Sequence, residues 1–390
     1  METERKIIVY FGMGFLPDQN AVACREQAIG YVIKKIGYKP VLIGISESIP
    51  LGEFEKKICG ELECYSISYA RTIKEKIKDT FFVEKTLVSI LKDVGIERIK
   101  CFIMQDYQLW PMKRVARFCS NNGIAFSADV MDWFTPSRDY PWIKNIIKGI
   151  DTVFRMYGFY PCLKNKIFIT NKFEDFFSKS KKYNSLVFPC TCIDALEANK
   201  IKDLENHRIT ITFAGFMGKK CEKEKLDWLI KALFENNSEI ELNIIGITQE
   251  EFVNNVPELT NKITEYIHFY GYLPHNECIK ILEQSDFAVI IRKCCKLTEY
   301  GFSSKICEAF AHGVPVITTN ISDNSLYISN GVNGYICDAD YESVKKLLKR
   351  IEKLTIEERN EIRYNLCEDN PLSIRNYIGS FSKFVDKLEV

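Results

Sequence analysis

The run GFSSKICEAFAHGVPVITTN, which starts at residue 301, gathers side chains that suit an anionic ligand. Ser304 stands where the N-cap of a helix is expected, Lys305 falls in the first turn, and Glu308 comes one turn later. Gly313 and Pro315 end this helix ahead of an apolar strand. Free amides and a lysine at a helix start suit a diphosphate, and a carboxylate one turn on can accept hydrogen bonds from a ribose. The run therefore predicts a nucleotide-sugar site.

This run resembles the donor-binding signature of GT-B glycosyltransferases, in particular the family 4 retaining enzymes of bacterial polysaccharide synthesis that carry Gly-Phe-x-Ser/Thr-Lys-x-x-Glu. The resemblance implies that Glu308 holds the donor ribose. In the widespread form of this signature, another glutamate lies upstream of the one that matches Glu308. Its spacing from Glu308 leads here to Tyr300, and Glu299 lies one residue earlier. Whether Tyr300 or Glu299 fills that position stays open. The resemblance also implies donor contacts by four loop residues: Gly301, Phe302, Ser303 and Ser304.

Arg292 ends an apolar strand just before this loop. A guanidinium at the mouth of a parallel strand is well placed for bidentate contacts with phosphate. The alternative is a surface arginine paired with Asp286 or Glu299. The family resemblance implies that Arg292 and Lys305 are catalytic, because they would stabilise the diphosphate leaving group as its charge develops.

Gly215 and Gly218 follow another predicted strand. Related enzymes carry an arginine after the first of these glycines and a lysine further on, and both grip the donor diphosphate. Here Phe216 replaces the arginine, and we expect Gly215 and Lys219 to contact the donor. Which lysine takes the second role stays open among four candidates: Lys219, Lys220, Lys223 and Lys225.

The first predicted strand leads into a loop with Gly12 and Gly14. A dinucleotide-binding fingerprint is unlikely there, since Pro17 takes the third glycine position and no acidic residue follows the second strand. The loop resembles the glycine-bearing loop of family 4 enzymes that lies near the transferred sugar, which implies a donor contact at Gly14. The alternative is a tight turn that needs glycine for its backbone.

Asp129, Asp132 and Trp133 come at the end of a predicted strand, where a carboxylate would face a cleft and an aromatic ring could stack on a sugar. The resemblance implies a catalytic role for Asp132 on the acceptor side. The alternative is that Asp132 caps the next turn.

We expect no metal site and no cofactor. The fifteen cysteines form no CxxC pair, and only four histidines accompany them. Asp338 and Asp340 imitate the DxD metal motif of GT-A enzymes, but they follow the last strand of the second half, where a helix-capping loop is expected.

Charge is divided unevenly along the 390 residues. Residues 1–190 carry 29 Lys and Arg against 21 Asp and Glu, a net charge of +8, and the remainder carries −7. The basic half suggests an anionic partner, such as a membrane surface or a lipid-diphosphate acceptor. Trp142, beside Lys144 and Lys148, is either an interfacial anchor or a core residue. No apolar run reaches membrane-spanning length, so we expect a cytoplasmic protein, peripheral at most to the inner face of the plasma membrane. Nothing in the sequence suggests a nucleic-acid partner.

Strand-like and helix-like runs alternate in both halves, which predicts an α/β fold with two Rossmann-like domains whose parallel sheets face each other across a cleft. We expect an N-terminal acceptor-side domain at 1–190 and a C-terminal nucleotide-sugar domain at 191–370. The resemblance implies that a final helix at 371–390 returns to the first domain. A strand is expected near Thr152–Arg155.

Together these features predict a metal-independent, retaining glycosyltransferase that moves a sugar from a nucleoside-diphosphate sugar to a glycan or lipid-linked acceptor in surface polysaccharide synthesis. Two alternatives are a sugar-nucleotide epimerase of the same fold and a non-catalytic partner that binds sugar nucleotides. The donor base, the sugar, the acceptor, the linkage and the oligomeric state cannot be read from the sequence.

Overall fold

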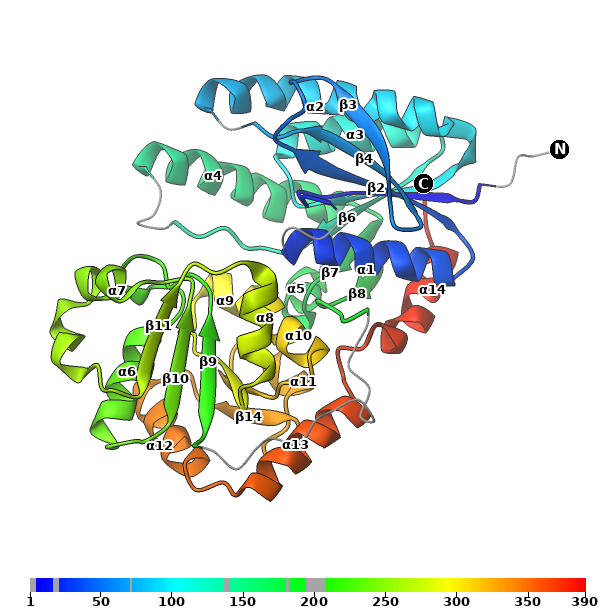
Figure 1. The fold of residues 1–390 in the computed structure, drawn as a ribbon. Helices are drawn as coiled ribbons and strands as arrows, with labels where there is room; N and C mark the ends of the chain where they lie inside the picture. Colours follow the sequence, from blue (N-terminus) through cyan, green and yellow to red (C-terminus); the bar gives the residue numbers. More distant parts are fainter. Residues whose placement is uncertain (1–4, 17–20, 71, 137–140, 180–181, 194–207) are drawn as a thin grey trace. The chain divides into compact units, whose positions relative to one another are not determined.

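The structure, a computed structural model, describes residues 5–16, 21–70, 72–136, 141–179, 182–193 and 208–390. The chain forms two compact units, one of Met1–Pro136, Trp142–Thr191 and Ile374–Val390, the other of Ser137–Pro141 and Cys192–Ser373. Each unit has a mainly parallel sheet with helices on its faces, which confirms the predicted α/β class (Figure 1). The two units are defined by contacts between residues. The domain limits predicted at residues 190 and 370 concern parts that fold independently, so they stay a prediction.

The sheet of the first unit has the strand order β3-β4-β2-β1-β5-β6-β7-β8. Its strands are β1 (Ile7–Phe11), β2 (Lys39–Ser46), β3 (Phe54–Cys59), β4 (Leu62–Ser68), β5 (Ile99–Gln105), β6 (Ala125–Val130), β7 (Asn165–Phe168) and β8 (Asn184–Val187). Every residue of β1 and β6 is buried, as expected for parallel strands covered on both faces. Among the described strands of this sheet, β3 alone runs antiparallel to its neighbour, as the outer strand of a hairpin with β4.

The α-helices in the described part of this unit are α1 (Ala21–Lys35), α2 (Ile73–Val94), α3 (Leu109–Asn121), α4 (Trp142–Phe154), α5 (Asn171–Phe177) and α14 (Ile378–Asp386). The strand expected near Thr152–Arg155 does not form, because these residues end α4 and begin a π-helical turn. Asp151 and Arg155 form an ion pair one helical turn apart, with 2.7 Å between Oδ2 and Nε. Such a pair supports the helix at the place where the apolar run suggested a strand.

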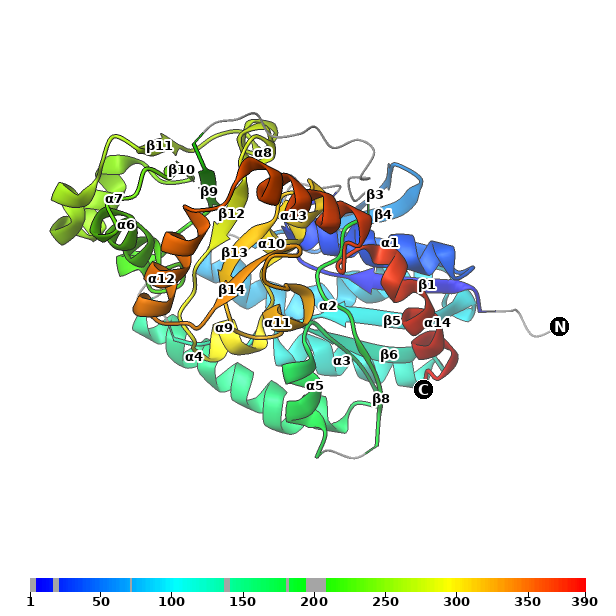
Figure 2. The same ribbon diagram turned by 90° about the horizontal axis from the view of Figure 1, so that it is seen from below.

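The C-terminal helix α14 contacts α1 and β8 of the first unit (Figures 1 and 2). Phe381 of α14 is fully buried, and its ring lies 5.7 Å from that of Phe188. Asn165 of β7 donates to the carbonyl of Glu389 and accepts from its amide. Helix α14 is therefore part of the core of the first unit, and the exposed Glu389 after it is hydrogen-bonded to β7.

A buried ion pair joins α1 to β6. The guanidinium of Arg25 donates to both carboxylate oxygens of Asp129, at 2.9 and 2.8 Å, and to the carbonyl oxygens of Phe188 and Pro189. Tyr10 donates its hydroxyl to the same carboxylate. Asp129 is fully buried, so the expectation that its carboxylate faces a cleft is wrong. Its partners tie three elements together instead.

The sheet of the second unit has the strand order β11-β10-β9-β12-β13-β14, all parallel. Its strands are β9 (Thr210–Ala214), β10 (Glu241–Ile245), β11 (Ile267–Gly271), β12 (Phe287–Ile290), β13 (Val316–Thr319) and β14 (Gly334–Cys337). Its helices are α6 (Leu226–Glu235), α7 (Gln249–Asn255), α8 (His275–Glu283), α9 (Lys296–Tyr300), α10 (Ser304–Ala311), α11 (Asn324–Tyr327), α12 (Tyr341–Ile351) and α13 (Ile356–Glu368). Apolar residues of α6 and α12 pack on the sheet and form a continuous core with it.

Candidate functional site

In each sheet the chain first adds strands on one side of a central strand and later continues on the other side of it. In the second unit the chain runs outward from β9 to β11 and then returns to β12 on the other side of β9. In the first unit the same reversal lies between β1 and β5. Ligands of open α/β sheets bind beyond the carboxyl ends of the strands at such switch points. The loops after β9 and β12, and after β1 and β5, are therefore the places where a ligand site is expected.

A buried carboxylate at the switch point of the second unit joins the two cations predicted to be catalytic. Glu224 Oε1 accepts from Arg292 Nε at 3.0 Å, from Arg292 Nη2 at 2.7 Å and from Lys305 Nζ at 3.2 Å. The backbone of Arg292 is held in turn by the Thr319 hydroxyl at the end of β13. Arg292, expected to pair with phosphate or else with Asp286 or Glu299, instead has Glu224 as its protein partner; Asp286 pairs with Arg359.

The three charged groups are strongly coupled. Burial alone would raise the pKa of Glu224, whose side chain is 1% exposed, but Arg292 and Lys305 outweigh this effect and lower it. Burial lowers the pKa of Lys305, and Glu224 opposes that shift. Glu224 Oε2 has no hydrogen-bond partner among the described residues. With the carboxylate ionised and both bases protonated, the cluster has a net charge of +1 and suits an anion.

Gly215, directly after β9, leaves the space that Lys305 occupies. A Cβ atom at this position would lie 2.2 Å from Lys305 Nζ, and the backbone has a φ of +140°. Both facts favour glycine, since L side chains rarely adopt this conformation and the lysine would have to move. The predicted donor residue Gly215 thus lies beside the predicted catalytic Lys305.

The N-cap of α10 lies one residue earlier than the sequence predicts. Ser303, not Ser304, is the N-cap of α10, and its side chain makes no capping hydrogen bond. Ser303 is buried, and its Oγ has no partner within the described parts of the chain. Ser304 is the first helical residue, because Ser303 has extended backbone angles and ends the loop. Gly301 caps the C-terminus of α9, and Phe302 packs edge-on against the ring of Tyr327.

Glu308 lies in the second turn of α10, with a side chain that is partly exposed. Its Oε1 is 2.8 Å from Nε2 of His275, the first residue of α8. Glu299, in the short helix α9, is half-buried. His275 was not among the predicted residues, because a lone histidine at a helix start carries no motif.

The remaining donor candidate of the second unit lies at the surface. Lys219 begins a short 3-10 turn, and its side chain is exposed. Phe216, which takes the place of the arginine that the family resemblance implies, is also exposed. Glu224 follows in the same lysine-rich stretch, and sequence reasoning missed it because a glutamate among lysines is typical of surface charge.

The switch point of the first unit holds a second buried carboxylate. Glu26 Oε1 accepts from the amide of Gly14 at 2.7 Å, and Gln105 Oε1 accepts from the amide of Met13 at 3.0 Å. A Cβ atom on Gly12 would lie 2.2 Å from Glu26 Oε1, and one on Gly14 would lie 2.6 Å from it. Glycine at these positions lets the loop close over the carboxylate. Glu26 Oε2 is buried without a partner among the described residues, and burial raises the pKa of Glu26 to about 8, against a lowering contribution from the Gly14 amide.

Asp132 follows β6 and is exposed. Its amide and that of Met131 both donate to Asp106 Oδ2, at 2.9 and 2.8 Å, so Asp106 fixes this loop. Trp133 is buried, and its ring stacks on Phe173. The sugar-stacking role considered for Trp133 is therefore wrong, because the indole face is covered within the first unit.

Three further observations concern metals and membranes. Among the described residues, no group of three or more His, Cys, Asp or Glu side chains lies close enough to hold a metal ion. Asp340 caps α12 by accepting from the amide of Ser343 at 2.9 Å, which confirms the helix-capping interpretation of the Asp-Ala-Asp run. Within the same described ranges, no helix is long and apolar enough to cross a membrane.

The protonation of Glu26 gives a prediction for stability against pH. The pKa of Glu26 is about 8 in the folded chain against an ordinary value of 4.5, so folding binds a proton between these values. Stability from this group is complete below pH 4.5 and falls as pH rises toward 8, by up to about 1.4 kcal/mol per pH unit. Glu26→Gln keeps an acceptor for Gly14 and should remove this slope. Urea unfolding between about pH 5 and 8 measures it, with the exposed Glu47→Gln as control. An unchanged slope in Glu26→Gln would contradict the buried protonated state.

The second prediction concerns Gly215→Ala. The added methyl group must displace Lys305, so one charge-assisted contact with an anion is lost and pyrophosphate should bind about tenfold more weakly. Calorimetric titration of inorganic pyrophosphate measures this change. Gly379→Ala in α14 is the matched control, because a Cβ atom added there would have no other atom within 4 Å. Equal pyrophosphate affinity in both variants would show that Lys305 does not hold the anion.

Known proteins share both the sequence pattern of the second unit and the fold of the whole chain. Residues 208–355 match the family described as Glycosyl transferases group 1. No curated protein matches the chain. The fold is similar over 98% of the chain to a structure described as trehalose-6-phosphate from E. coli bound with UDP-2-fluoro glucose (TM-score 0.68, 13% identity, 99% of that chain). It is also similar over 98% of the chain to sucrose-phosphate synthase from Thermosynechococcus elongatus (TM-score 0.68, 10% identity, 99% of that chain).

A third similar structure is HepE from Anabaena in complex with UDP and glucose (TM-score 0.63, 11% identity, 98% of this chain and 100% of that chain). At such identities the structural likeness concerns the fold, whereas the family match covers the unit that holds Glu224, Arg292 and Lys305. The structural likenesses therefore show the GT-B fold over the whole chain, and residues 208–355 carry the sequence pattern of group 1 glycosyltransferases.

Proposed function

We propose that this protein is a glycosyltransferase that transfers a sugar, with retention of anomeric configuration, from a nucleoside-diphosphate sugar to a glycan or lipid-linked acceptor of surface polysaccharide synthesis. The observation that carries the proposal is the cluster of Arg292, Lys305 and Glu224 at the start of α10 and the switch point of the second sheet. A nucleoside diphosphate leaves with negative charge, and this cluster offers two fixed cations to stabilise it.

The cluster is organised before any ligand binds. Glu224 fixes both cations through one oxygen, so little reorganisation is needed when charge develops on the leaving phosphate. The free amides of the first turn of α10 add a positive helix end. The unpartnered hydroxyl of Ser303, buried at the same helix start, supplies a further donor for a phosphate oxygen.

Glu308 suits the ribose in this arrangement. Its carboxylate lies one turn into α10 and has one oxygen engaged with His275. The other oxygen can accept a hydrogen bond from a ribose hydroxyl. Uridine diphosphate is the first nucleotide to test, because two of the similar structures contain UDP or a UDP sugar.

In the proposed reaction the bond between the sugar C1 and the β-phosphate oxygen breaks, and the acceptor oxygen forms its bond to C1 on the same face. The acceptor proton passes to the leaving phosphate oxygen, so no general base from the chain is required. Arg292 and Lys305 bind and orient that phosphate. Roles for Gly14 and Asp132 toward the sugar and the acceptor, and for Lys219, Glu299, Gly301 and Phe302 toward the donor, remain part of the proposal.

An epimerase of the same fold and a non-catalytic binding partner make different predictions from a transferase. A panel of nucleotide sugars incubated with and without a glycan or lipid acceptor pool separates them. A transferase releases nucleoside diphosphate faster with acceptor, an epimerase converts the sugar without releasing nucleotide, and a binding partner leaves the donor intact. Product NMR then shows whether the anomeric configuration is retained.

The third prediction tests the ribose role of Glu308. Glu308→Ala should weaken UDP binding by about 1.5–3 kcal/mol, because a charged hydrogen bond is lost at a partly exposed position that does not support the core. Isothermal titration measures the affinity. Glu283→Ala is a matched control, since Glu283 forms the same kind of histidine pair, with His312 at 2.8 Å, in the same unit. Equal affinities for UDP in the two variants would show that Glu308 does not bind the ribose.

The fourth prediction is that turnover survives chelation. Arg292, Lys305 and the amides of α10 are proposed to meet the phosphate charge, a role that divalent ions fill in other enzymes. Activity measured with EDTA should equal activity with magnesium. If EDTA abolished turnover and magnesium restored it, Arg292, Lys305 and the amides of α10 would not be sufficient to stabilise the phosphate charge.

A further inference from the structure

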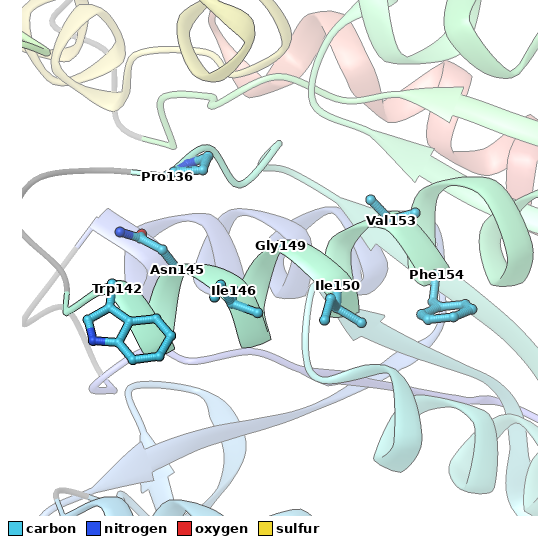
Figure 3. Close-up of a pocket in the computed structure, with 8 residues that line it drawn as sticks. All are labelled: Pro136, Trp142, Asn145, Ile146, Gly149, Ile150, Val153 and Phe154. Carbon is cyan, nitrogen blue, oxygen red and sulfur yellow. The ribbon is translucent and has the colours of Figure 1, made fainter.

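Two features of the chain take no part in the proposed reaction, and the exposed side of α4 is the first of them. Figure 3 shows Trp142, Ile150 and Phe154 on one side of this helix. Trp142 is 71% exposed, so the alternative that it belongs to the core is wrong. Its role as an interfacial anchor stays a prediction, because nothing in the described structure shows what covers this side of α4.

The second feature is a pair of thiols in the second unit. Cys192 Sγ lies 3.6 Å from Cys307 Sγ, although the two residues are 115 positions apart in the sequence. The Cys192 thiol donates to the carbonyl oxygen of Cys307 at 3.2 Å. A disulfide bond needs about 2.05 Å between its sulfur atoms, so the two sulfurs would have to approach each other by about 1.5 Å. Rotation of one cysteine side chain between staggered positions moves its sulfur atom farther than this, so the pair is within reach of a disulfide.

The backbone around both thiols is held in place. The amide of Cys192 donates to the carbonyl oxygen of Leu372 at 2.8 Å. The side chain of Asn370 donates to the carbonyl oxygen of Phe310, near the end of α10, at 3.0 Å, and it also lies 3.9 Å from Cys192 Sγ. These contacts fasten Cys192 to the helix that carries Cys307.

The two thiols differ in their access to solvent, and this difference assigns their roles. Cys192 is 3% exposed, whereas Cys307, the fourth residue of α10, is half-buried. An oxidant from solution therefore meets Cys307 first, and Cys192 is placed to attack the oxidised sulfur from inside. A solvent-accessible cysteine beside a second cysteine that resolves it is typical of reversible redox sites.

We propose that Cys192 and Cys307 form a redox modification site, in which hydrogen peroxide converts the two thiols into a disulfide. The sulfur of Cys307 attacks one peroxide oxygen, which gives a sulfenic acid and releases one molecule of water. The sulfur of Cys192 then attacks the sulfenic sulfur, the S–S bond forms, and the hydroxyl group leaves as a second molecule of water. Both thiol protons end in water, and the peroxide accepts the two electrons that the sulfur atoms lose.

The disulfide would stabilise the fold. It would link residues that are 115 positions apart, and such a link restricts the unfolded chain. The site lies on the same helix as Lys305 and Glu308, but its chemistry needs neither of them and does not rest on the proposed transfer reaction.

Mass spectrometry of the full chain tests the proposal. The reduced chain is treated with a small excess of hydrogen peroxide, the remaining thiols are alkylated with iodoacetamide, and the chain is digested with trypsin. Peptides 183–200 and 306–345 should be found joined, and dithiothreitol should separate them. Each peptide contains a second cysteine, Cys190 in one and Cys337 in the other, so fragment ions assign the bond to Cys192 and Cys307.

Serine variants separate this bond from other oxidation. Oxidation should raise the melting temperature of the unmodified chain by on the order of 5 °C. Cys192→Ser and Cys307→Ser should each abolish both the joined peptides and this rise. Serine is close in size to cysteine, so the reduced variants should melt like the reduced unmodified chain. Cys367→Ser is the matched control, because Cys367 is also half-buried in a helix of the second unit, and it should behave like the unmodified chain.

Three results would overturn the proposal. The first is separate alkylation of Cys192 and Cys307 after the peroxide treatment. The second is oxidation of Cys307 to a sulfinic acid without a cross-link. The third is a joined pair that forms with equal yield in the urea-unfolded chain, because the folded contact would then not direct the bond.

Discussion

The carboxylate of Glu224 is the interaction on which the proposed donor site depends. Two cations that lie side by side repel each other and lose hydration when they are partly buried, and both effects favour their neutral or displaced forms. One ionised oxygen shared between Arg292 and Lys305 offsets this cost and holds both groups within 3.2 Å of a common point. The cluster keeps one net positive charge, which attracts an anion without leaving a buried cation unpaired.

Glycine permits that arrangement in both units. Gly215 gives Lys305 the space to reach Glu224, and Gly12 and Gly14 let a loop close over Glu26. Each carboxylate lies at the switch point of its own sheet, after strands that are buried on both faces. The parallel sheets thus position two buried carboxyl groups of different character: an ionised one between two cations in the second unit and a largely protonated one in the first.

The regular elements were readable from the sequence where apolar runs were continuous. β6 and β10 consist almost entirely of buried residues, so their apolar runs stand out as strands in the sequence. The hairpin of β3 and β4 was missed because β3 is an edge strand whose lysines and glutamate face solvent. The prediction of a strand at Thr152–Arg155 was wrong because α4 has apolar side chains on its exposed face. The helix therefore lacks the polar stripe that usually identifies a surface helix in a sequence.

The candidate site was only partly predictable. Arg292, Lys305 and Glu308 stood out through their motif, whereas Glu224, Glu26 and His275 are defined by tertiary neighbours that lie 33 to 81 positions away or by the folding of a loop. The cap of α10 was misplaced by one residue because Ser303 and Ser304 are chemically identical, and only the backbone angles distinguish them. Short-range patterns identify elements, but they do not report which buried charges meet.

A crystal structure of the chain with bound UDP tests the central claim most directly. The account predicts that the β-phosphate lies within hydrogen-bond distance of Arg292, Lys305 and the first amides of α10, with Glu224 still bound to both cations. A nucleotide whose diphosphate lies elsewhere, with Arg292 and Lys305 contacting only Glu224, would contradict it.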